Sequence, residues 1–513
     1  MRRSEETEFR KRGGTVLRAG QTTSILTAGA ATAVLAALTP TTAFAAQEPL
    51  EGFGRQQLRW ERCAEDQPPS LECTTVKVPL DYGDPHGRSI GIAVSRMKAG
   101  SAAKRRGVLL MNPGGPGGPG LTMPAEMAPL LAAGVRERFD LIGFDPRGVG
   151  RSAPVNCALA ADEQVLDHPY SAGTFGQDVA RARSVADKCW AKAGDLLPHI
   201  TTRNTARDMD VVRAALGERK ISYLGHSYGT YLGAVYTQIF PRRADRFVLD
   251  SALDPALVWR GVLRGATEAA ELAFTRWTEW TAARDATYGL GATPQAVRAA
   301  FWDLVASADR TPIVLEGQPF DGDTIRAQYR AFVQVEAVTP FIVALKAAAA
   351  GAAPPAGSSA AVPAVTEAAA EAPDVDNVVS VAWAVLCGEG RSWPRDPEQY
   401  RRDAIRDRAA RPLAGDFGAN VQPCAFWKSA PREAATAVDN GVDALIVQNE
   451  WDPQTPLVMA KGMRRALHGS RMVTIAGGEG HGVLVTGRPS CADADVTRYL
   501  TTGRLPAKDR TCS

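Results

Sequence analysis

After its first 45 residues the chain has no apolar run long enough to cross a roughly 30 Å hydrocarbon core, which argues against a membrane-spanning protein. It has no internal repeats and no block of basic residues, so nucleic acid is not expected as its main partner. Its cysteines lack CxxC spacing and partner histidines, which argues against a metal site. No glycine-rich segment ends in GKS or GKT, which argues against a P-loop that binds phosphate.

The N-terminus has the pattern of an export signal. Six basic and three acidic residues fall within residues 1–18, and residues 25–38 then run without a charge. This apolar run is too short to span a bilayer, and it leads to Ala43-Phe44-Ala45, a small-x-small cleavage site. We therefore expect a signal peptide over residues 1–45, cleavage after Ala45 and a secreted, extracellular protein.

Removal of this segment balances the charge of the chain. The whole chain has 59 Lys and Arg against 56 Asp and Glu, and six and three of these lie in residues 1–45. The remainder is formally neutral, so an anionic membrane is not expected as a partner after cleavage.

All eight cysteines follow the signal segment, and they are Cys63, Cys73, Cys157, Cys189, Cys387, Cys424, Cys491 and Cys512. An even number of cysteines in an exported chain indicates disulfides, although eight cysteines allow 105 pairings. The cysteines fall into four pairs of sequential neighbours, so we expect the first to pair with the second, the third with the fourth and so on. Each disulfide would then close a local loop.

The rest of the chain has the pattern of an α/β fold. A predicted strand pair joined by a turn comes first, over residues 74–80 and 89–96. Short apolar runs then alternate with helical stretches, and the runs are 107–111, 139–144, 221–224 and 246–249, with one helix predicted over 125–138. This alternation predicts a mostly parallel sheet with helices on both faces.

At 513 residues the chain exceeds one average domain, and the alternation stops after residue 255. Residues 256–438 have helical periodicity in pieces and are predicted to be a mainly helical lid inserted into the core. Within them, residues 347–373 are mostly Ala, Pro, Gly and Ser and are expected to form a mobile loop. The strand pattern returns at 444–448 and 471–475, so the core is predicted over 46–255 and 439–513.

Gly225-His226-Ser227-Tyr228-Gly229 fits the G-x-S-x-G nucleophile elbow of the α/β-hydrolase fold. It follows an apolar strand and precedes a helix, which is the context that the elbow requires. Ser227 is therefore the predicted nucleophile of a serine hydrolase. His226 beside it is predicted to be structural, because neighbouring side chains diverge on a tight turn.

In this fold the acid and then the base follow the serine along the chain. His481 lies in a glycine-rich loop directly after the last apolar strand and is the predicted base, whereas His468 near a helix end is expected to have a surface role. Asp452 ends the preceding strand and is the predicted acid that orients the imidazole. Asp250, at the end of the earlier strand, is the alternative.

A serine hydrolase also needs backbone N–H groups that stabilise the oxyanion. One comes from the residue after the nucleophile, Tyr228, and the other is predicted from Gly115 in the glycine-rich loop 111–120, with Gly114 as the alternative. Asp145 and Arg147, in the segment after the strand 139–144, are predicted to brace this loop and the elbow.

Four segments together resemble the secreted tripeptidyl aminopeptidases of actinomycetes and, more broadly, proline iminopeptidase-like hydrolases. They are Asn-Pro-Gly-Gly-Pro-Gly, Asp-Pro-Arg-Gly-x-Gly-x-Ser, Gly-His-Ser-Tyr-Gly-Thr-Tyr-Leu-Gly and Asp-Pro-x-Thr-Pro. The resemblance covers nearly all of the mature chain and implies the triad Ser227, Asp452 and His481. It also implies release of tripeptides from free peptide N-termini, so peptides are the expected partners, and no metal or organic cofactor is needed.

Recognition of a terminal amine requires a carboxylate, because a charge-assisted hydrogen bond can hold the ammonium. The family usually has Ala-Ile-x-Cys-x-Asp late in the lid, where this chain has Glu389 in place of the Asp. Glu389 is the first candidate and Glu336 the second. A carboxylesterase or lipase with the same triad is the alternative function, since the fold does not fix the leaving group. A binding protein without catalysis is a third possibility, which the intact triad disfavours.

Overall fold

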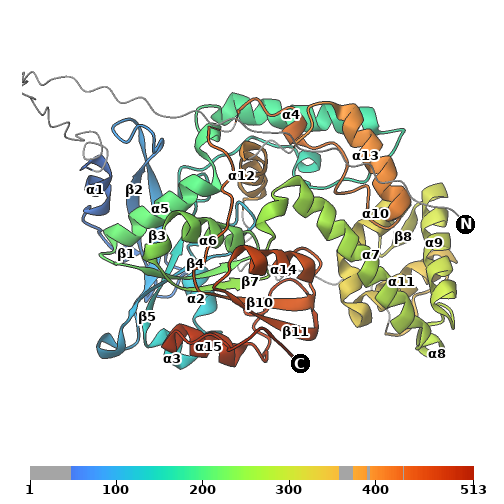
Figure 1. The fold of residues 1–513 in the computed structure, drawn as a ribbon. Helices are drawn as coiled ribbons and strands as arrows, with labels where there is room; N and C mark the ends of the chain where they lie inside the picture. The colour runs from blue at the N-terminus through green and yellow to red at the C-terminus, as the bar shows by residue number, and fades with distance from the viewer. Residues whose placement is uncertain (1–47, 358–373, 390–392, 431) are drawn as a thin grey trace, which may run out of the picture. The chain divides into compact units, whose positions relative to one another are not determined.

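The computed structural model describes residues 48–357, 374–389, 393–430 and 432–513 (Figure 1). These residues belong to the second of two compact units of the chain, Gln47–Ser513. The predicted signal peptide, residues 1–45, lies outside them. None of the helices in the described ranges is both long and apolar enough to cross a membrane.

Ten strands form one mixed sheet. In the order in which they pair they are β1 (Glu61–Arg62), β2 (Glu72–Pro79), β3 (Ser89–Met97), β5 (Phe139–Phe144), β4 (Gly107–Asn112), β6 (Ile221–His226), β7 (Ala244–Asp250), β10 (Ala444–Trp451), β11 (Arg471–Glu479) and β12 (Arg510–Cys512). The strands from β5 to β12 in this order run parallel, whereas β1, β2 and β3 pair antiparallel. The predicted strand pair is therefore β2 and β3.

Helices cover both faces of this sheet, as predicted (Figure 1). On β4, Val108 and Leu110 pack in one cluster, and Leu109 and Met111 pack in the other. The first cluster includes side chains of α5 (Thr202–Ala215), α6 (Tyr228–Ile239) and α14 (Leu457–Ala466). The second includes side chains of α2 (Met123–Met127), α3 (Ala133–Arg136) and α15 (Asp493–Thr502). Alternate residues of a buried strand thus serve two apolar layers.

The single helix predicted over 125–138 is wrong, because α2 and α3 are separate short helices. Pro129 lies between them, and its missing N–H cannot continue the helical hydrogen bonds. The described residues begin with α1 (Glu48–Gly54). Their 3-10 helices are η1 (Ala102–Lys104), η2 (Ala161–Glu163), η3 (Leu197–His199), η4 (Pro241–Arg243), η5 (Pro255–Leu257), η6 (Ala327–Val333) and η7 (Pro423–Ala425).

Between β7 and β10 the described residues are mainly helical. The helices are α7 (Arg260–Ala282), α8 (Asp285–Tyr288), α9 (Pro294–Arg310), α10 (Gly322–Arg326), α11 (Val335–Ala349), α12 (Val375–Gly388) and α13 (Pro397–Ala410). Phe274, Trp277, Phe301 and Phe332 centre an apolar cluster that is separate from the two layers at the sheet. A small hairpin of β8 (Ile313–Leu315) and β9 (Gln318–Phe320), which the sequence analysis does not predict, joins α9 to α10.

The predicted mobile loop 347–373 falls mostly outside the described residues, which omit 358–373. The prediction is wrong for residues 347–349, because they form the C-terminal end of α11 and not a loop. Alanine is the best helix former, so an alanine run at a helix end extends the helix.

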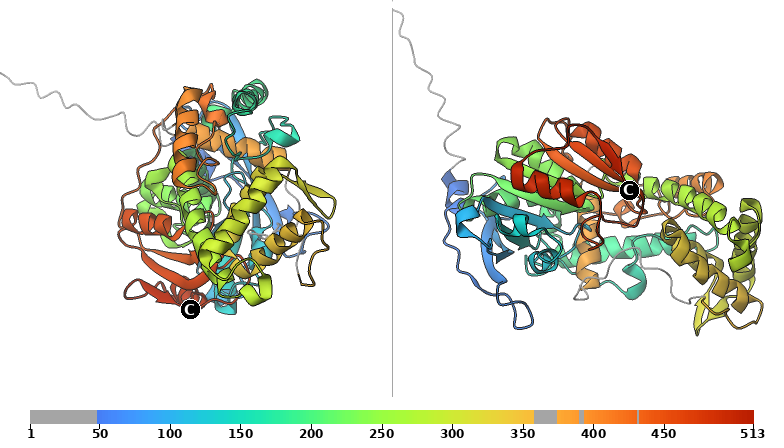
Figure 2. Two further views of the ribbon diagram at one scale, coloured as in Figure 1. Left: turned by 90° about the vertical axis from the view of Figure 1, so that its right-hand side faces the viewer. Right: turned by 90° about the horizontal axis from the view of Figure 1, so that it is seen from below.

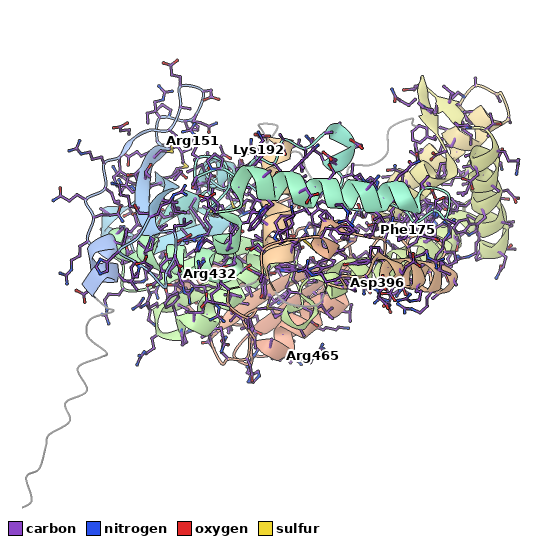
Figure 3. All side chains as sticks on the ribbon, turned by 90° about the horizontal axis from the view of Figure 1, so that it is seen from above. Arg151, Phe175, Lys192, Asp396, Arg432 and Arg465 are labelled. Carbon is purple, nitrogen blue, oxygen red and sulfur yellow. A yellow bond between two sulfur atoms is a disulfide. The ribbon has the colours of Figure 1, made fainter. Side chains whose placement is uncertain are left out.

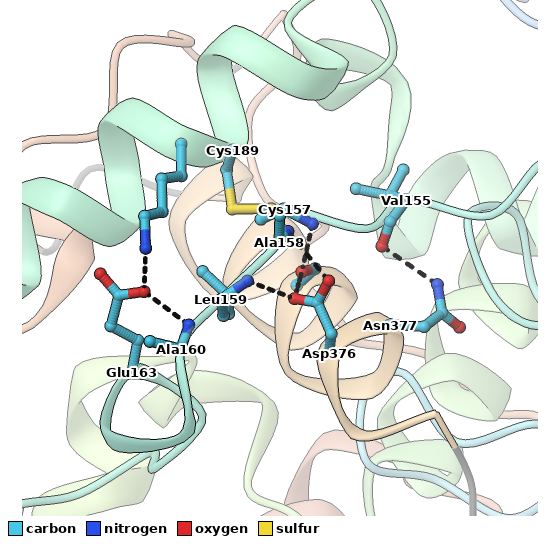
Figure 4. Close-up of a disulfide and its surroundings, with 11 residues drawn as sticks. Val155, Cys157, Ala158, Leu159, Ala160, Glu163, Cys189, Asp376 and Asn377 are labelled. Carbon is cyan, nitrogen blue, oxygen red and sulfur yellow. Dashed lines mark hydrogen bonds and ion pairs between the residues drawn. A yellow bond between two sulfur atoms is a disulfide. The ribbon is translucent and has the colours of Figure 1, made fainter.

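Four disulfides join sequential neighbours, which confirms the predicted pairing. They are Cys63–Cys73, Cys157–Cys189, Cys387–Cys424 and Cys491–Cys512. The second one attaches the segment after β5 to α4 (Phe175–Ala193), the long helix that runs from the labelled Phe175 to Lys192 in Figure 3. Beside it, the Asp376 carboxylate of α12 accepts the N–H groups of Ala158 and Leu159, at 2.9 and 3.0 Å (Figure 4). These contacts anchor α12 on the core next to the candidate site.

Candidate active site

Ser227 lies in a strained turn between β6 and α6. Its φ of 55° and ψ of −123° fall in a region that side chains other than glycine rarely adopt. A Cβ at Gly225 would lie 2.4 Å from the Gly229 carbonyl oxygen, and one at Gly229 would lie 2.8 Å from the Asn112 carbonyl oxygen. Both glycines of the motif are therefore required sterically, and the turn is held by the Ser227 N–H, which donates to the Asp250 carbonyl at 3.0 Å.

His481 and Asp452 form a buried pair at the ends of the adjacent strands β11 and β10. The imidazole Nδ1 lies 3.0 Å from each carboxylate oxygen, and the side chains of His481 and Asp452 are 3% and 0% exposed. The carboxylate can only accept when ionised, so Nδ1 carries the proton and Nε2 keeps its lone pair. Burial raises the pKa of Asp452, whereas His481 and the backbone N–H groups of Thr455 and Gln454 lower it. The lowering effects together are larger, so the pKa of Asp452 lies below its ordinary value.

Hydrogen bonds also join the loops that carry the acid and the base. The Gly480 N–H donates to the Trp451 carbonyl at 3.0 Å, and the Asn449 amide donates to the carbonyls of Gly480 and Gly482 at 3.0 and 2.8 Å. Asn449 is not predicted from the sequence, because its partners lie more than 30 residues away. Its position in the strand that ends near Asp452 is the one signal for it.

Asp250, the alternative acid, is fully buried at the end of β7. Its carboxylate accepts the backbone N–H groups of Val483 and Leu484, at 2.9 and 2.8 Å, and the neighbouring Ser251 hydroxyl accepts the Gly482 N–H at 2.8 Å. Burial raises the pKa of Asp250 to about 6, and these N–H groups oppose that shift. Asp250 therefore anchors the backbone of the His481 loop, whereas Asp452 contacts the imidazole.

The glycine-rich loop after β4 lies against the nucleophile. A Cβ at Gly114, whose φ is +96°, would lie 2.5 Å from the His226 carbonyl oxygen and 3.0 Å from the Ser227 Cβ. The Gly114 N–H already donates to the Asn112 side chain at 3.1 Å. In the described part of the chain the N–H groups of Gly115 and Tyr228 have no such partner, so both remain available as hydrogen-bond donors.

Asp145 braces the glycine-rich loop as predicted, whereas the hydrogen bonds of Arg147 reach Asp208 and the carbonyls of Pro79, Leu80 and His199 instead of the loop or the elbow. The Asp145 carboxylate accepts the N–H groups of Gly120 and Leu121, at 2.9 and 3.2 Å, and so fixes the far end of the glycine-rich loop. The buried Arg147 guanidinium pairs with Asp208 at 2.6 Å and donates to three backbone carbonyls. Neither residue is engaged with the triad.

Comparisons with known proteins agree with this geometry. Residues 107–298 match the family of the alpha/beta hydrolase fold, and residues 411–512 match the family of TAP-like proteins. The chain is 36% identical over 477 residues to the tripeptidyl aminopeptidase of Streptomyces lividans, and this match covers 90% of the chain and 87% of that protein. The chain belongs to the tripeptidyl aminopeptidase family. It is a serine hydrolase with the α/β-hydrolase fold.

Two further proteins are similar to the chain. The chain is 31% identical over 499 residues to the serine protease Hip1 of Mycobacterium tuberculosis, with 89% of the chain and 91% of that protein covered. It is 34% identical over 215 residues to carboxylesterase B of the same organism, with only 39% of the chain and 41% of that protein covered.

Glu389, the first candidate for binding the substrate amine, is buried at the C-terminal end of α12. Its carboxylate accepts the Thr202 N–H and, at 3.3 Å, the Trp259 indole N–H. It lines a cavity of about 270 Å³ together with Thr202 and Tyr231. Burial raises the pKa of Glu389 to about 7, against the lowering effect of its hydrogen-bond donors.

A short path joins Glu389 to the nucleophile. The Thr202 hydroxyl lies 2.9 Å from the hydroxyl of Tyr228, the residue after Ser227. Glu336, the second candidate, is exposed in the first turn of α11. His468 is 63% exposed and forms an ion pair with Asp439 at 2.8 Å, as expected of a surface residue. The described residues contain no group of His, Cys, Asp and Glu arranged to hold a metal ion.

Proposed function

We propose that this chain is a secreted exopeptidase that releases tripeptides from the free N-termini of peptides, with Ser227, Asp452 and His481 as its triad. The observation that carries the triad is the buried His481–Asp452 pair, whose Nδ1 contacts leave Nε2 as a proton acceptor. The similarity to a tripeptidyl aminopeptidase over nine-tenths of the chain supports the substrate class.

In the first half of the reaction, the Ser227 hydroxyl attacks the carbonyl carbon of the substrate amide and gives its proton to Nε2 of His481. The negative charge on the former carbonyl oxygen is stabilised by the N–H groups of Gly115 and Tyr228. Asp452 stays ionised and stabilises the imidazolium that forms. The imidazolium then protonates the amine, which leaves as the shortened peptide.

In the second half, water attacks the acyl ester on Ser227 and His481 takes its proton. The tetrahedral intermediate forms in the same oxyanion site, and its collapse releases the tripeptide carboxylate and returns the proton to Ser227. The chain itself supplies every proton carrier and every group that stabilises charge in these steps.

We assign recognition of the substrate amine to Glu389, with Glu336 as the second candidate. The hydrogen bonds of Glu389 to Thr202 and Trp259 use one donor at each oxygen, so acceptor capacity remains for an ammonium group. A bound cation favours the ionised carboxylate and thus lowers the raised pKa of Glu389.

Mass spectrometry of the products from a defined peptide tests the proposal directly. We expect successive losses of three residues from the free N-terminus, and no products when the same peptide is acetylated. Equal turnover of the acetylated peptide contradicts amine recognition. The Ser227→Ala variant is the control, and it should be folded and inactive.

A carboxylesterase is the second candidate, because 215 residues of the chain are 34% identical to carboxylesterase B. The alcohol of an ester is a better leaving group than the amine of an amide. A triad that cleaves amides therefore also hydrolyses esters if its pocket admits them. Cleavage of short acyl esters without cleavage of tripeptidyl anilides or Ala-Ala-Pro-type amides favours the esterase.

Export is proposed from the signal pattern of residues 1–45 and from the use of all cysteines in disulfides. N-terminal sequencing of the protein from a culture medium should begin at Ala46. Retention of the full-length chain in the cells contradicts this proposal.

A further inference from the structure

His226 has contacts that its expected structural role does not explain. Its Nδ1 lies 3.1 Å from the carbonyl oxygen of Pro113, the residue before the two glycines of the oxyanion loop. On its other side, the ring centroid lies 4.6 Å from that of His481, with 50° between the planes. One side chain therefore contacts both the loop that stabilises charge and the ring that moves the proton.

The protonation of His226 follows from these contacts. A carbonyl oxygen only accepts, so Nδ1 must carry the hydrogen and Nε2 the lone pair. Burial, followed by the proximity of His481, lowers the pKa of His226 to about 3, so the ring is neutral throughout the neutral pH range. A ring with so low a pKa is a poor proton acceptor, so His226 is not the base for Ser227 although its Nε2 has no hydrogen-bond partner in the described structure.

The oxyanion loop is held on β6 at two neighbouring points. The His226 side chain holds Pro113 through its hydrogen bond. The Gly114 backbone packs so closely on β6 that a Cβ at Gly114 would lie 2.5 Å from the His226 carbonyl oxygen. Gly115, the proposed donor, follows directly. Loss of the side-chain bond frees the first of these points, and a donor displaced by a fraction of an ångström stabilises an oxyanion less well.

The side of the ring that faces the base is equally close-packed. Nε2 of His226 is buried and has no hydrogen-bond partner in the described structure. A Cβ at residue 482, which follows the base, would lie 3.2 Å from this atom, and Gly482 avoids the contact. The His226 ring thus fills the space beside His481.

We propose that His226 is a positioning residue, which ties the oxyanion loop to the His481 ring and keeps both aligned on Ser227. The inference rests on the proposed triad but not on a peptide substrate, because the oxyanion and the proton transfer are common to esters and amides.

Three substitutions separate the two contacts. His226→Asn keeps a donor near the position of Nδ1 and loses the ring, His226→Phe keeps a ring and loses the donor, and His226→Ala loses both. His168→Phe is the matched control, since it replaces another partly buried histidine, on a loop held by Asn420. Each variant is measured with a tripeptidyl anilide and with p-nitrophenyl acetate, after its unfolding midpoint has been compared with that of the unmodified protein.

We expect His226→Ala to lower kcat about 100-fold on both substrates, with KM changed less than about twofold, because a misplaced oxyanion donor affects the transition state. A tripeptidyl trifluoromethyl ketone forms an adduct that has an oxyanion, so its inhibition constant should rise by a similar factor. The inhibition constant of the product tripeptide should not change. His226→Asn should recover about tenfold of the lost kcat, and His226→Phe should recover less.

Three results overturn the proposal: kcat of His226→Ala within about threefold of normal, a loss confined to KM, or His226→Asn no faster than His226→Ala at equal stability. Failure of the proposed function has a different signature. If only p-nitrophenyl acetate is cleaved, the peptidase assignment fails and the His226 test still proceeds on the ester. If Ser227→Ala remains active, it is the triad that is wrong.

Discussion

Two buried carboxylates lie at the ends of the adjacent parallel strands β7 and β10, and their pKa values are shifted in opposite directions. They are Asp250 and Asp452. The pKa of Asp250 is raised to about 6 and that of Asp452 is lowered, although burial raises both. The difference lies in their partners. Asp250 accepts the backbone N–H groups of Val483 and Leu484 and the Ser251 hydroxyl, whereas Asp452 contacts the imidazole itself.

This comparison shows that position at a strand end does not by itself identify a catalytic acid. Both carboxylates act on His481, one by holding the backbone of its loop and the other by orienting its ring. Only a residue that contacts the ring can stabilise the charge that forms on it. The same amide substitution at the two positions therefore separates the two roles.

The largest effect is expected for Asp452→Asn. An amide does not enforce the imidazole tautomer or stabilise the imidazolium, so kcat should fall about 10⁴-fold with little change in KM. Steady-state kinetics with a tripeptidyl anilide measures it. If this variant keeps more than a tenth of the normal kcat, Asp452 is not the acid, and Asp250 becomes the alternative again.

Glu389→Gln tests a third buried carboxylate, which lies away from the triad. Loss of its charge should lower kcat/KM for free-amine substrates about 30-fold through KM, and should leave p-nitrophenyl acetate, which has no amine, unaffected.

The pH dependence provides an independent check on Glu389. Because the pKa of Glu389 is raised to about 7, KM for free-amine substrates should rise as the pH falls below about 7 and the carboxylate becomes protonated. In Glu389→Gln that rise should disappear. An equal effect of the substitution on the hydrolysis of p-nitrophenyl acetate indicates a structural role instead.

A smaller effect is expected for Asp250→Asn, the matched counterpart of Asp452→Asn. The amide oxygen can still accept an N–H group of the His481 loop, so kcat should fall about tenfold or less. The ratio of the two kcat losses measures the difference between holding the loop and orienting the ring. Equal losses remove the distinction.

The sequence predicts the parts of this site that depend on chain order. Ser227, Asp452 and His481 each follow an apolar strand, and in a parallel sheet such positions meet at one edge. The anchoring role of Asp250 was not predictable, because its partners Val483 and Leu484 are more than 230 residues away and contribute backbone atoms, which leave no mark in the sequence.

The inserted region was predicted less completely than the core. Helical periodicity is local, so the helical character of 256–438 was evident, but Ile313–Leu315 and Gln318–Phe320 are too short to show strand alternation. The burial of Glu389 is likewise invisible in the sequence, since it depends on Thr202 and Trp259 from two other segments.

The finest distinction between the two aspartates lies in the stability of the fold. A raised pKa means that the folded chain holds the proton of Asp250 more tightly than the unfolded chain. The contribution of this proton to stability is complete below pH 3.8 and is lost as the pH rises through about 6. Asp250→Asn cannot titrate, so its free energy of unfolding relative to that of the unmodified protein should rise by about 1 to 3 kcal/mol between pH 4 and pH 7. Urea unfolding at both pH values measures the change. A change of the opposite sign means that the N–H groups of Val483 and Leu484 outweigh the burial of Asp250, which then has the same electrostatics as Asp452.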